Sequence, residues 1–152
     1  MKIDSEPVSA DPPLRYFDAS ALVKRYLAEP GSERVRSLLS DGIVATSRLS
    51  EVEVASALAR RCREGAFPAD ERDRALGALR RDISSFFVVE LTPEIVARAV
   101  ALLSRAALRA ADALQLASCI ELRHRLQVDC VFVCADTLLS AAARQEGVLT
   151  AP

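Results

Sequence analysis

The 152-residue chain has no tryptophan and a single histidine, and only 5% of its residues are aromatic. His124 stands between Arg123 and Arg125 in a helical stretch, where a solvated helix face explains it better than catalysis or metal binding. The chain therefore lacks the parts of a serine or cysteine triad, a histidine general base and a zinc site. Because aromatics are scarce, the core must be built from Ala, Leu and Val, which favours helices packed around a sheet.

The cysteines are few and follow no metal-binding spacing. They are Cys62, Cys119, Cys130 and Cys134. The last two share one apolar run, in which an extended strand would hold them too far apart to bridge. We expect four buried thiols in a reducing cytoplasm. The sequence also lacks a bilayer-spanning apolar run and a signal-peptide hydrophobic region, which predicts a cytoplasmic protein with no membrane contact.

Charge of one sign is also lacking, because 20 basic and 21 acidic residues leave a net charge of −1. No global basic field attracts nucleic acid, although a local patch is compatible with this balance. The basic residues are nearly all arginine, with lysine only at Lys2 and Lys24. Arginine suits phosphate recognition, but a GC-rich gene produces the same bias.

Short apolar runs alternate with segments of helical periodicity from residue 14 onwards. We predict strands at residues 14–17, 43–46, 86–91, 130–134 and 148–150, and helices at 19–28, 32–40, 47–64, 69–84, 93–107, 110–126 and 137–146. This alternation predicts an α/β fold: a three-layer α/β/α sandwich with a central, mostly parallel sheet of four to five short strands. Residues 1–13 have no apolar periodicity and are expected to form a disordered tail before a single domain at 14–150.

Two aspartates follow apolar runs at points where a predicted strand passes into a helix. Asp18 follows the run that ends at Phe17, and Asp136 follows the run that ends at Cys134. In a parallel sheet these strand ends lie on one edge, where such folds bind ligands. Each aspartate is also explained as a helix cap.

Two further acids fall in the first turns of predicted helices. Asp112 has the alternative explanation of complementing a helix dipole. Glu53 fits a capping box with Ser50, but it also borders an expected apolar stripe and would then point along the sheet edge. That stripe comprises Leu49, Val52, Ala55, Ala59 and Cys62.

Four converging carboxylates would repel one another unless a cation neutralised them. Oxygen ligands select a hard ion such as Mg²⁺ or Mn²⁺. A divalent ion held in this way, with waters still bound, suits phosphoryl chemistry because it activates the attacking water.

The segments that carry these acids resemble the PIN-domain ribonucleases, and in particular the VapC-like toxins of toxin–antitoxin pairs. The matching segments begin at Tyr16, Glu29, Thr46, Asp112 and Val133, and they read YFDASALVKRY, EPGSE, TSRLSEVEV, DALQLA and VCAD. The resemblance runs from about residue 14 to residue 148 and preserves the order and spacing of the motifs.

This resemblance implies a metal site formed by Asp18, Glu53, Asp112 and Asp136, with Ser20 as an outer hydroxyl. It implies Mg²⁺- or Mn²⁺-dependent endonucleolytic cleavage of RNA, a small antitoxin partner and a homodimer. The chain departs from the family pattern at Cys134, where Thr or Ser is common, and at Gln115, where His or another residue is frequent. These departures affect the fine positioning of metal waters and substrate.

The candidates for RNA phosphate contacts are arginines close in sequence to the acids, each with a solvated-surface role as the alternative: Arg15, Arg25, Arg48 and Arg109. A second hypothesis is a PIN-fold interaction module with weak or no nuclease activity. In that case an apolar groove that involves Leu58, Ala66, Phe67 and Leu76 would bind a partner helix. A third is a haloacid-dehalogenase-like phosphatase with Asp18 as nucleophile, although Ser20 stands where that family has a second acid.

Overall fold

The computed structural model describes residues 11–151 and has a five-stranded sheet at its centre. The strands are β1 (Leu14–Phe17), β2 (Ile43–Ser47), β3 (Phe87–Val89), β4 (Cys130–Val133) and β5 (Leu149–Ala151). Their order is β3-β2-β1-β4-β5, and all neighbouring pairs are parallel. The predicted fold class is confirmed. The predicted tail lies mostly outside the described residues, and positions 11–13 have no regular secondary structure.

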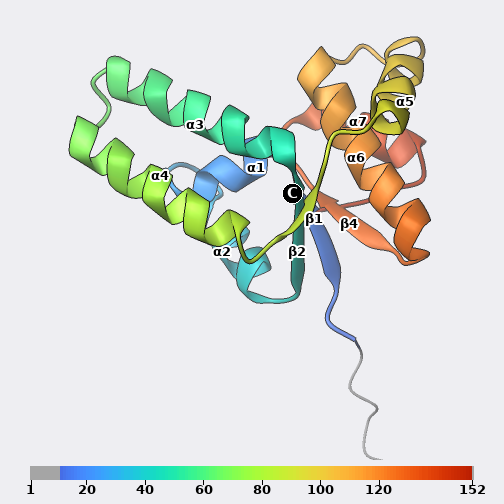
Figure 1. Cartoon of the computed structure of the whole chain (residues 1–152), viewed down its shortest axis with the longest axis horizontal. Helices are drawn as coiled ribbons and strands as arrows, with labels where there is room; N and C mark the ends of the chain where they lie inside the picture. Colours follow the sequence, from blue (N-terminus) through green and yellow to red (C-terminus); the bar gives the residue numbers. More distant parts are fainter. Residues whose placement is uncertain (1–10, 152) are drawn as a thin grey trace, which may run out of the picture.

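Helices cover both faces of the sheet, and Figure 1 shows them as two groups. One group comprises α1 (Ala19–Leu22), the short 3₁₀ helix η1 (Val23–Arg25), α2 (Ser32–Ser40), α3 (Arg48–Arg63) and α4 (Ala69–Ile83). The other comprises α5 (Pro93–Leu103), α6 (Ala110–Leu126) and α7 (Thr137–Gln145). Successive strand residues enter opposite cores: Tyr16 packs with α5 and α6, whereas Phe17 packs with α1 to α4. A parallel sheet buried on both faces requires this pattern of apolar runs.

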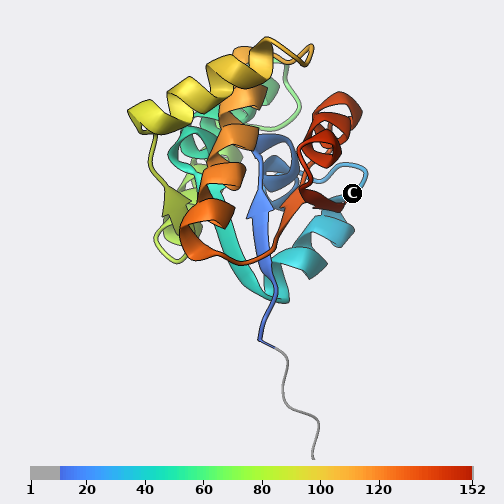
Figure 2. The same ribbon diagram turned by 90° about the vertical axis from the view of Figure 1, so that its right-hand side faces the viewer.

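The strand order reverses between β1 and β4, at the middle of the sheet (Figure 2). The chain adds β2 and β3 on one side of β1, then crosses over and adds β4 and β5 on the other. Phe17 is in register with Val133, and the Asp18 N–H donates to the Val133 carbonyl at 3.2 Å. Open α/β sheets bind ligands at such a reversal point. The fold therefore places the residues that follow β1 and β4 where a site is expected.

Several local predictions need correction. The helix predicted over residues 19–28 ends at Leu22 and tightens into η1, where Arg25 and Tyr26 both reach Asp82 on α4. Cys62 is only partly buried, whereas the other three thiols are buried.

The largest correction concerns α3. Its N-cap is Ser47, whose Oγ accepts the Leu49 N–H at 3.1 Å, so Ser50 and Glu53 form no capping box. The buried residues of the helix are Ser50, Val54 and Leu58. Val52, which we assigned to the apolar stripe, is 67% exposed. The buried face of α3 is therefore a different face from the apolar stripe that we predicted, and it includes Ser50. None of the helices in residues 11–151 combines the length and apolar character needed to cross a membrane.

Candidate active site

Asp18 is the most deeply buried of the four predicted acids. It follows β1 and caps α1, and its Oδ1 accepts the Ala21 N–H at 2.9 Å. The Ser20 hydroxyl lies 2.8 Å from Oδ1 and 2.9 Å from Oδ2. Only 2% of the residue is exposed, and this burial raises its pKa from 3.8 to about 6, although the hydrogen bonds oppose the shift. Asp18 is therefore a costly group to ionise in the folded protein.

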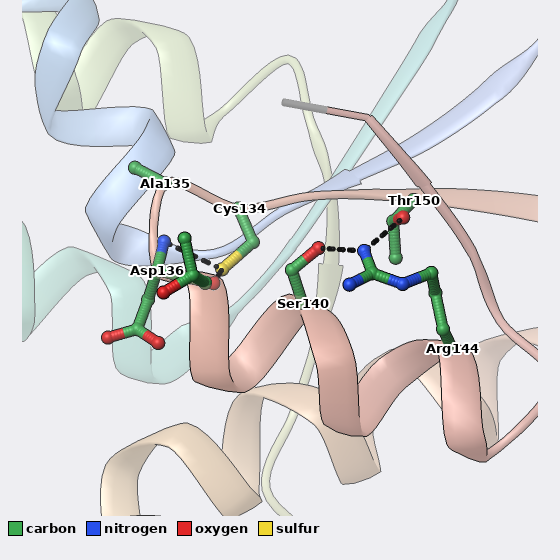
Figure 3. Close-up of a pocket in the computed structure, with 7 residues that line it drawn as sticks. Cys134, Ala135, Asp136, Ser140, Arg144 and Thr150 are labelled. Atoms are coloured by element: carbon green, nitrogen blue, oxygen red, sulfur yellow. Dashed lines mark hydrogen bonds between the residues drawn. The ribbon is translucent and has the colours of Figure 1, made fainter.

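Asp136 occupies the equivalent place after β4. Its Oδ1 accepts the Leu139 N–H at 2.9 Å and so caps α7. The Cys134 thiol accepts the Asp136 N–H at 3.2 Å and lies 3.3 Å from its carbonyl oxygen (Figure 3). Burial raises the pKa of Cys134 to about 12, which keeps this sulfur protonated and able to donate. The Ser20 hydroxyl oxygen accepts the Ala135 N–H at 3.1 Å, so one side chain links the turns that carry Asp18 and Asp136.

Glu53 and Asp112 come from helices and are half-buried. Glu53 lies in the second turn of α3, and its Oε2 accepts a 2.6 Å hydrogen bond from the Gln115 amide on α6. Burial raises the pKa of Glu53, Gln115 lowers it, and Asp112 raises it further. Asp112 lies in the first turn of α6, and both burial and Asp136 raise its pKa.

The four carboxylates form a chain of electrostatic repulsion. Glu53 raises the pKa of Asp18, Asp112 raises that of Glu53, and Asp136 raises that of Asp112. In the part of the chain that the structure describes, none of the four has an arginine or lysine nitrogen within 4 Å. Acids as far apart in the sequence as Asp18 and Asp136 therefore belong to one electrostatic cluster, in which the Arg109 charge lowers the pKa of Asp112.

A cleft of about 720 Å³ opens over this edge of the sheet. Glu53, Asp112, Asp136 and Ser20 line it, and Asp18 lies behind Ser20, whose hydroxyl bonds both of its carboxylate oxygens. Among residues 11–151, no three acidic, histidine or cysteine side chains stand close enough to enclose a metal ion. The acids are brought to one edge but not into a preformed cage, since Asp18 and Asp136 also cap helices.

The oxygen-only donor set fits a hard divalent ion such as Mg²⁺ or Mn²⁺. Burial is the main cause that raises the pKa values of Asp18, Glu53 and Asp112, and repulsion between the acids adds to it. A cation would relieve that repulsion.

Of the four predicted RNA-contacting arginines, only Arg109 lines the cleft. The other three are engaged elsewhere. Arg15 pairs with Asp41 and donates to the Leu38 carbonyl at the end of α2, Arg25 pairs with Asp82, and Arg48 pairs with Glu51 and Glu90.

Three cations that we did not predict also line the cleft: Lys24, Arg60 and Arg61. Lys24 is tied to Glu29 and to the Pro30 carbonyl. Arg60 follows Glu53 by seven residues on α3, and residues at that spacing share one helix face. Helical periodicity counted from the acid would therefore have identified Arg60.

The PIN domain family profile matches residues 15–145. The chain belongs to the PIN-domain family. Two curated PIN-domain relatives of Mycobacterium tuberculosis, Ribonuclease VapC45 and Ribonuclease VapC49, are each 38% identical to it over 146 residues, which cover 92% of this chain and 96% of theirs. The resemblance to VapC-like proteins is thereby confirmed.

Solved structures share this PIN fold at lower identity. VapC20 of Mycobacterium tuberculosis, described as a sarcin–ricin loop cleaving toxin, superposes with a TM-score of 0.63 at 20% identity over 84% of this chain and 93% of its own. FitAcB of Neisseria gonorrhoeae gives a TM-score of 0.64 at 16% identity over 91% and 97%. A toxin–antitoxin complex of Klebsiella pneumoniae gives 0.57 at 18% identity over 81% and 87%.

Proposed function

We propose that the protein is a metal-dependent endoribonuclease that acts as the toxin of a toxin–antitoxin pair. The observation that carries this proposal is the set of four mutually repelling carboxylates, without ion-pair partners in the described chain, where the strand order reverses. The 38% identity to two VapC ribonucleases over nearly the whole chain supports the same activity.

The residues have distinct tasks in this proposal. Asp18, Glu53, Asp112 and Asp136 hold Mg²⁺ or Mn²⁺, and Ser20 orients the Asp18 carboxylate through its hydroxyl. When bound, such an ion would polarise a phosphate oxygen of RNA and lower the pKa of the attacking water. Water then displaces one ribose oxygen from phosphorus, and the chain is cut internally.

The cleft provides for the RNA backbone as well as for the ion. Arg60, Arg61 and Arg109 line it, and none of them forms an ion pair among the described residues. Their guanidinium groups are available to phosphate oxygens, which bind arginine well. The net charge of −1 therefore does not prevent RNA binding, because the local surface carries the needed charge.

The direct test is cleavage of RNA by the purified protein with Mn²⁺ or Mg²⁺. Asp18→Asn should lower the rate by more than the roughly 100-fold that loss of an outer-shell partner costs a metal site. Asp82→Asn is the matched control, because Asp82 is paired with Arg25 away from the cleft. We expect it to cleave normally and, unlike Asp18→Asn, to arrest growth when expressed. Undiminished cleavage by Asp18→Asn would refute the site.

An antitoxin partner is the second part of the proposal. A groove of about 380 Å³ lies between residues 26–28, which follow η1, and the hairpin formed by α3 and α4. This hairpin extends beyond the sheet in Figure 1. Its apolar lining includes Tyr26, Leu27 and Phe67, flanked by Arg36 and Arg61. Of the groove residues predicted from sequence, Phe67 and Ala66 line it, whereas Leu58 is fully buried. A groove of this kind suits an amphipathic segment.

The interaction-module hypothesis and the toxin hypothesis predict different results in one experiment. Both predict that a small protein encoded beside this gene copurifies with the chain, but only the toxin hypothesis predicts RNA cleavage after that protein is removed. The family assignment removes the haloacid-dehalogenase-like alternative.

A homodimer is the third part. Val96, Val100 and Leu103 repeat at helical spacing on α5 and are 47%, 62% and 40% exposed. An apolar stripe of this kind is typical of an interface. Sedimentation of the wild type and of Val100→Glu tests it, since the charge should shift a dimer toward monomer.

A further inference from the structure

A buried hydrogen-bond network lies beneath the cleft and is centred on Gln115 of α6. This glutamine is 1% exposed. Its Oε1 accepts the Tyr16 hydroxyl at 2.7 Å, and its Nε2 lies 2.6 Å from Glu53 Oε2 and 2.9 Å from Ser50 Oγ. An ionised carboxylate can only accept, so the nitrogen of the amide must face Glu53. Both N–H groups of Gln115 then have acceptors, and its carbonyl oxygen accepts one hydrogen bond.

The network continues to the backbone next to Asp18. Thr46 Oγ1 lies 2.7 Å from both the Phe17 carbonyl and Ser50 Oγ. Thr46 has one hydroxyl proton, and the carbonyl can only accept, so Ser50 must donate to Thr46. The bonds thus run in one direction from Gln115 through Ser50 and Thr46 to Phe17, the residue before Asp18. Elements α3, α6, β2 and β1 are joined beneath the acids.

Glu53 needs such a partner because of where it lies. Asp18 and Asp136 are held by free N–H groups at helix N-termini, from Ala21 and Leu139. Glu53 lies in the second turn of α3, beyond the free first-turn N–H groups, because the helix starts at Arg48. Its long side chain also has more rotamers to restrict than an aspartate has. The hydrogen bond that holds this carboxylate therefore comes from another side chain.

We propose that Gln115 is the positioning residue for Glu53: it holds Oε2 through its amide and leaves Oε1 available to a divalent ion. This inference rests on the proposed function and adds to it, because Gln115 itself touches neither ion nor RNA.

The test is Mn²⁺ affinity, measured by calorimetry without RNA and well below the unfolding temperature. Gln115→Met has a similar length but no donor, and it should weaken Mn²⁺ binding by about 10- to 100-fold, as loss of a partner behind a metal ligand does. The Mn²⁺ concentration for half-maximal cleavage should rise by the same factor, while the rate at saturating Mn²⁺ changes less. Gln115→Asn keeps the amide but is one methylene shorter, so it should fold readily and lose affinity as well.

Two control variants separate positioning from general support of the fold. Ser50→Ala removes the other acceptor of the Gln115 amide and should lower stability without weakening Mn²⁺ binding. Gln145→Met changes an exposed glutamine of α7 and should alter neither. In the metal-free protein, the carboxyl ¹³C resonance of Glu53 should shift in Gln115→Met and stay in place in Ser50→Ala.

The outcomes are distinct. Wild-type Mn²⁺ affinity in Gln115→Met and Gln115→Asn overturns the inference, as does an equal loss of affinity in Ser50→Ala. An unshifted Glu53 resonance in Gln115→Met overturns it independently of metal. If the wild type binds no Mn²⁺, the proposed function fails first, and a shifted resonance would then still show that Gln115 orients Glu53.

Discussion

Asp18 and Asp82 are both aspartates that accept hydroxyl hydrogen bonds, yet their surroundings are opposite. Asp82 on α4 accepts from the Arg25 guanidinium, with Nη2 at 3.1 Å, and from the Tyr26 hydroxyl at 2.8 Å. Arg25 and Tyr26 hold its pKa below the ordinary value. Asp18 accepts from Ser20 and Ala21, and burial raises its pKa to about 6. Asp82 is paired with the Arg25 guanidinium, whereas Asp18 has no ion-pair partner among the described residues.

The difference is the one expected between an acid that stabilises the fold and an acid of the proposed active site. A surface ion pair such as Arg25–Asp82 contributes little, about 0.2–1 kcal/mol, and asks for no ligand. A buried acid that faces other acids lowers stability when ionised, and such strained groups concentrate at functional sites. Under the proposed function, a divalent ion would supply the positive charge that the acids after β1 and β4 do not receive from an ion pair among the described residues.

The largest expected effect is on the pH dependence of the free energy of unfolding. Asp18 and Asp82 should contribute to it with opposite signs. The pKa of Asp18 rises from 3.8 in the unfolded chain to about 6 in the folded protein. Between these values the folded state binds more protons, so the free energy of unfolding falls as pH rises, by about 3 kcal/mol at pH 7. Asp18→Asn keeps a good N-cap and should be more stable than the metal-free wild type at pH 7. Urea unfolding from pH 2 to pH 7 measures this.

The same series gives its own control. The pKa of Asp82 is lowered, so its contribution is present above the ordinary pKa and is lost as pH falls toward the folded-state value. Asp82→Asn should therefore flatten the acid side of the profile and leave the window between pH 4 and pH 6 unchanged. Identical profiles for wild type and Asp18→Asn would contradict the assignment of Asp18 as the destabilising acid.

Mn²⁺ should offset the loss of stability that ionised Asp18 causes at pH 7. A ligand that binds only the folded state at 100 times its dissociation constant adds about 2.7 kcal/mol, which corresponds to a rise of roughly 5–10 °C in the melting temperature for a chain of this size. Thermal unfolding with and without a chelator measures the shift. Asp18→Asn should show little shift and Asp82→Asn a full one; equal shifts in both would place the ion elsewhere.

The sequence predicted where Asp18 and Asp136 lie in the fold because the signals are local. An apolar run, an aspartate and a helical repeat lie within a few residues of Asp18, and the same holds for Asp136. The partner of Glu53 was not predictable, because Gln115 lies 62 positions away and becomes a neighbour only when α6 packs on α3. The face of α3 was misjudged for a related reason. Ser50 is buried because Thr46 and Gln115 satisfy its hydroxyl, and a buried serine breaks the apolar period.

Breaking the ion pair of the other region should have a smaller effect. Asp82→Asn removes the charge that pairs with Arg25, whose side chain is 39% exposed, so we expect a loss of about 1 kcal/mol or less in the free energy of unfolding at pH 7. Urea titration measures it beside Asp18→Asn, which should move in the opposite direction. A stabilised Asp82→Asn would show that the two aspartates do not differ as described.

The smallest expected effect is on RNA binding, where Arg109 of the cleft should contribute and Arg25 beside Asp82 should not. Arg109 lines the cleft, whereas the Arg25 guanidinium is held by Asp82. In an Asp18→Asn background that binds RNA without cutting it, Arg109→Met should weaken binding and reduce the slope of log affinity against log salt by about one phosphate contact, or about 0.7 for single-stranded RNA. Arg25→Met should leave the slope unchanged, because its charge is already neutralised. Fluorescence anisotropy over a salt series measures both slopes, and equal losses would mean that RNA extends beyond the cleft to η1.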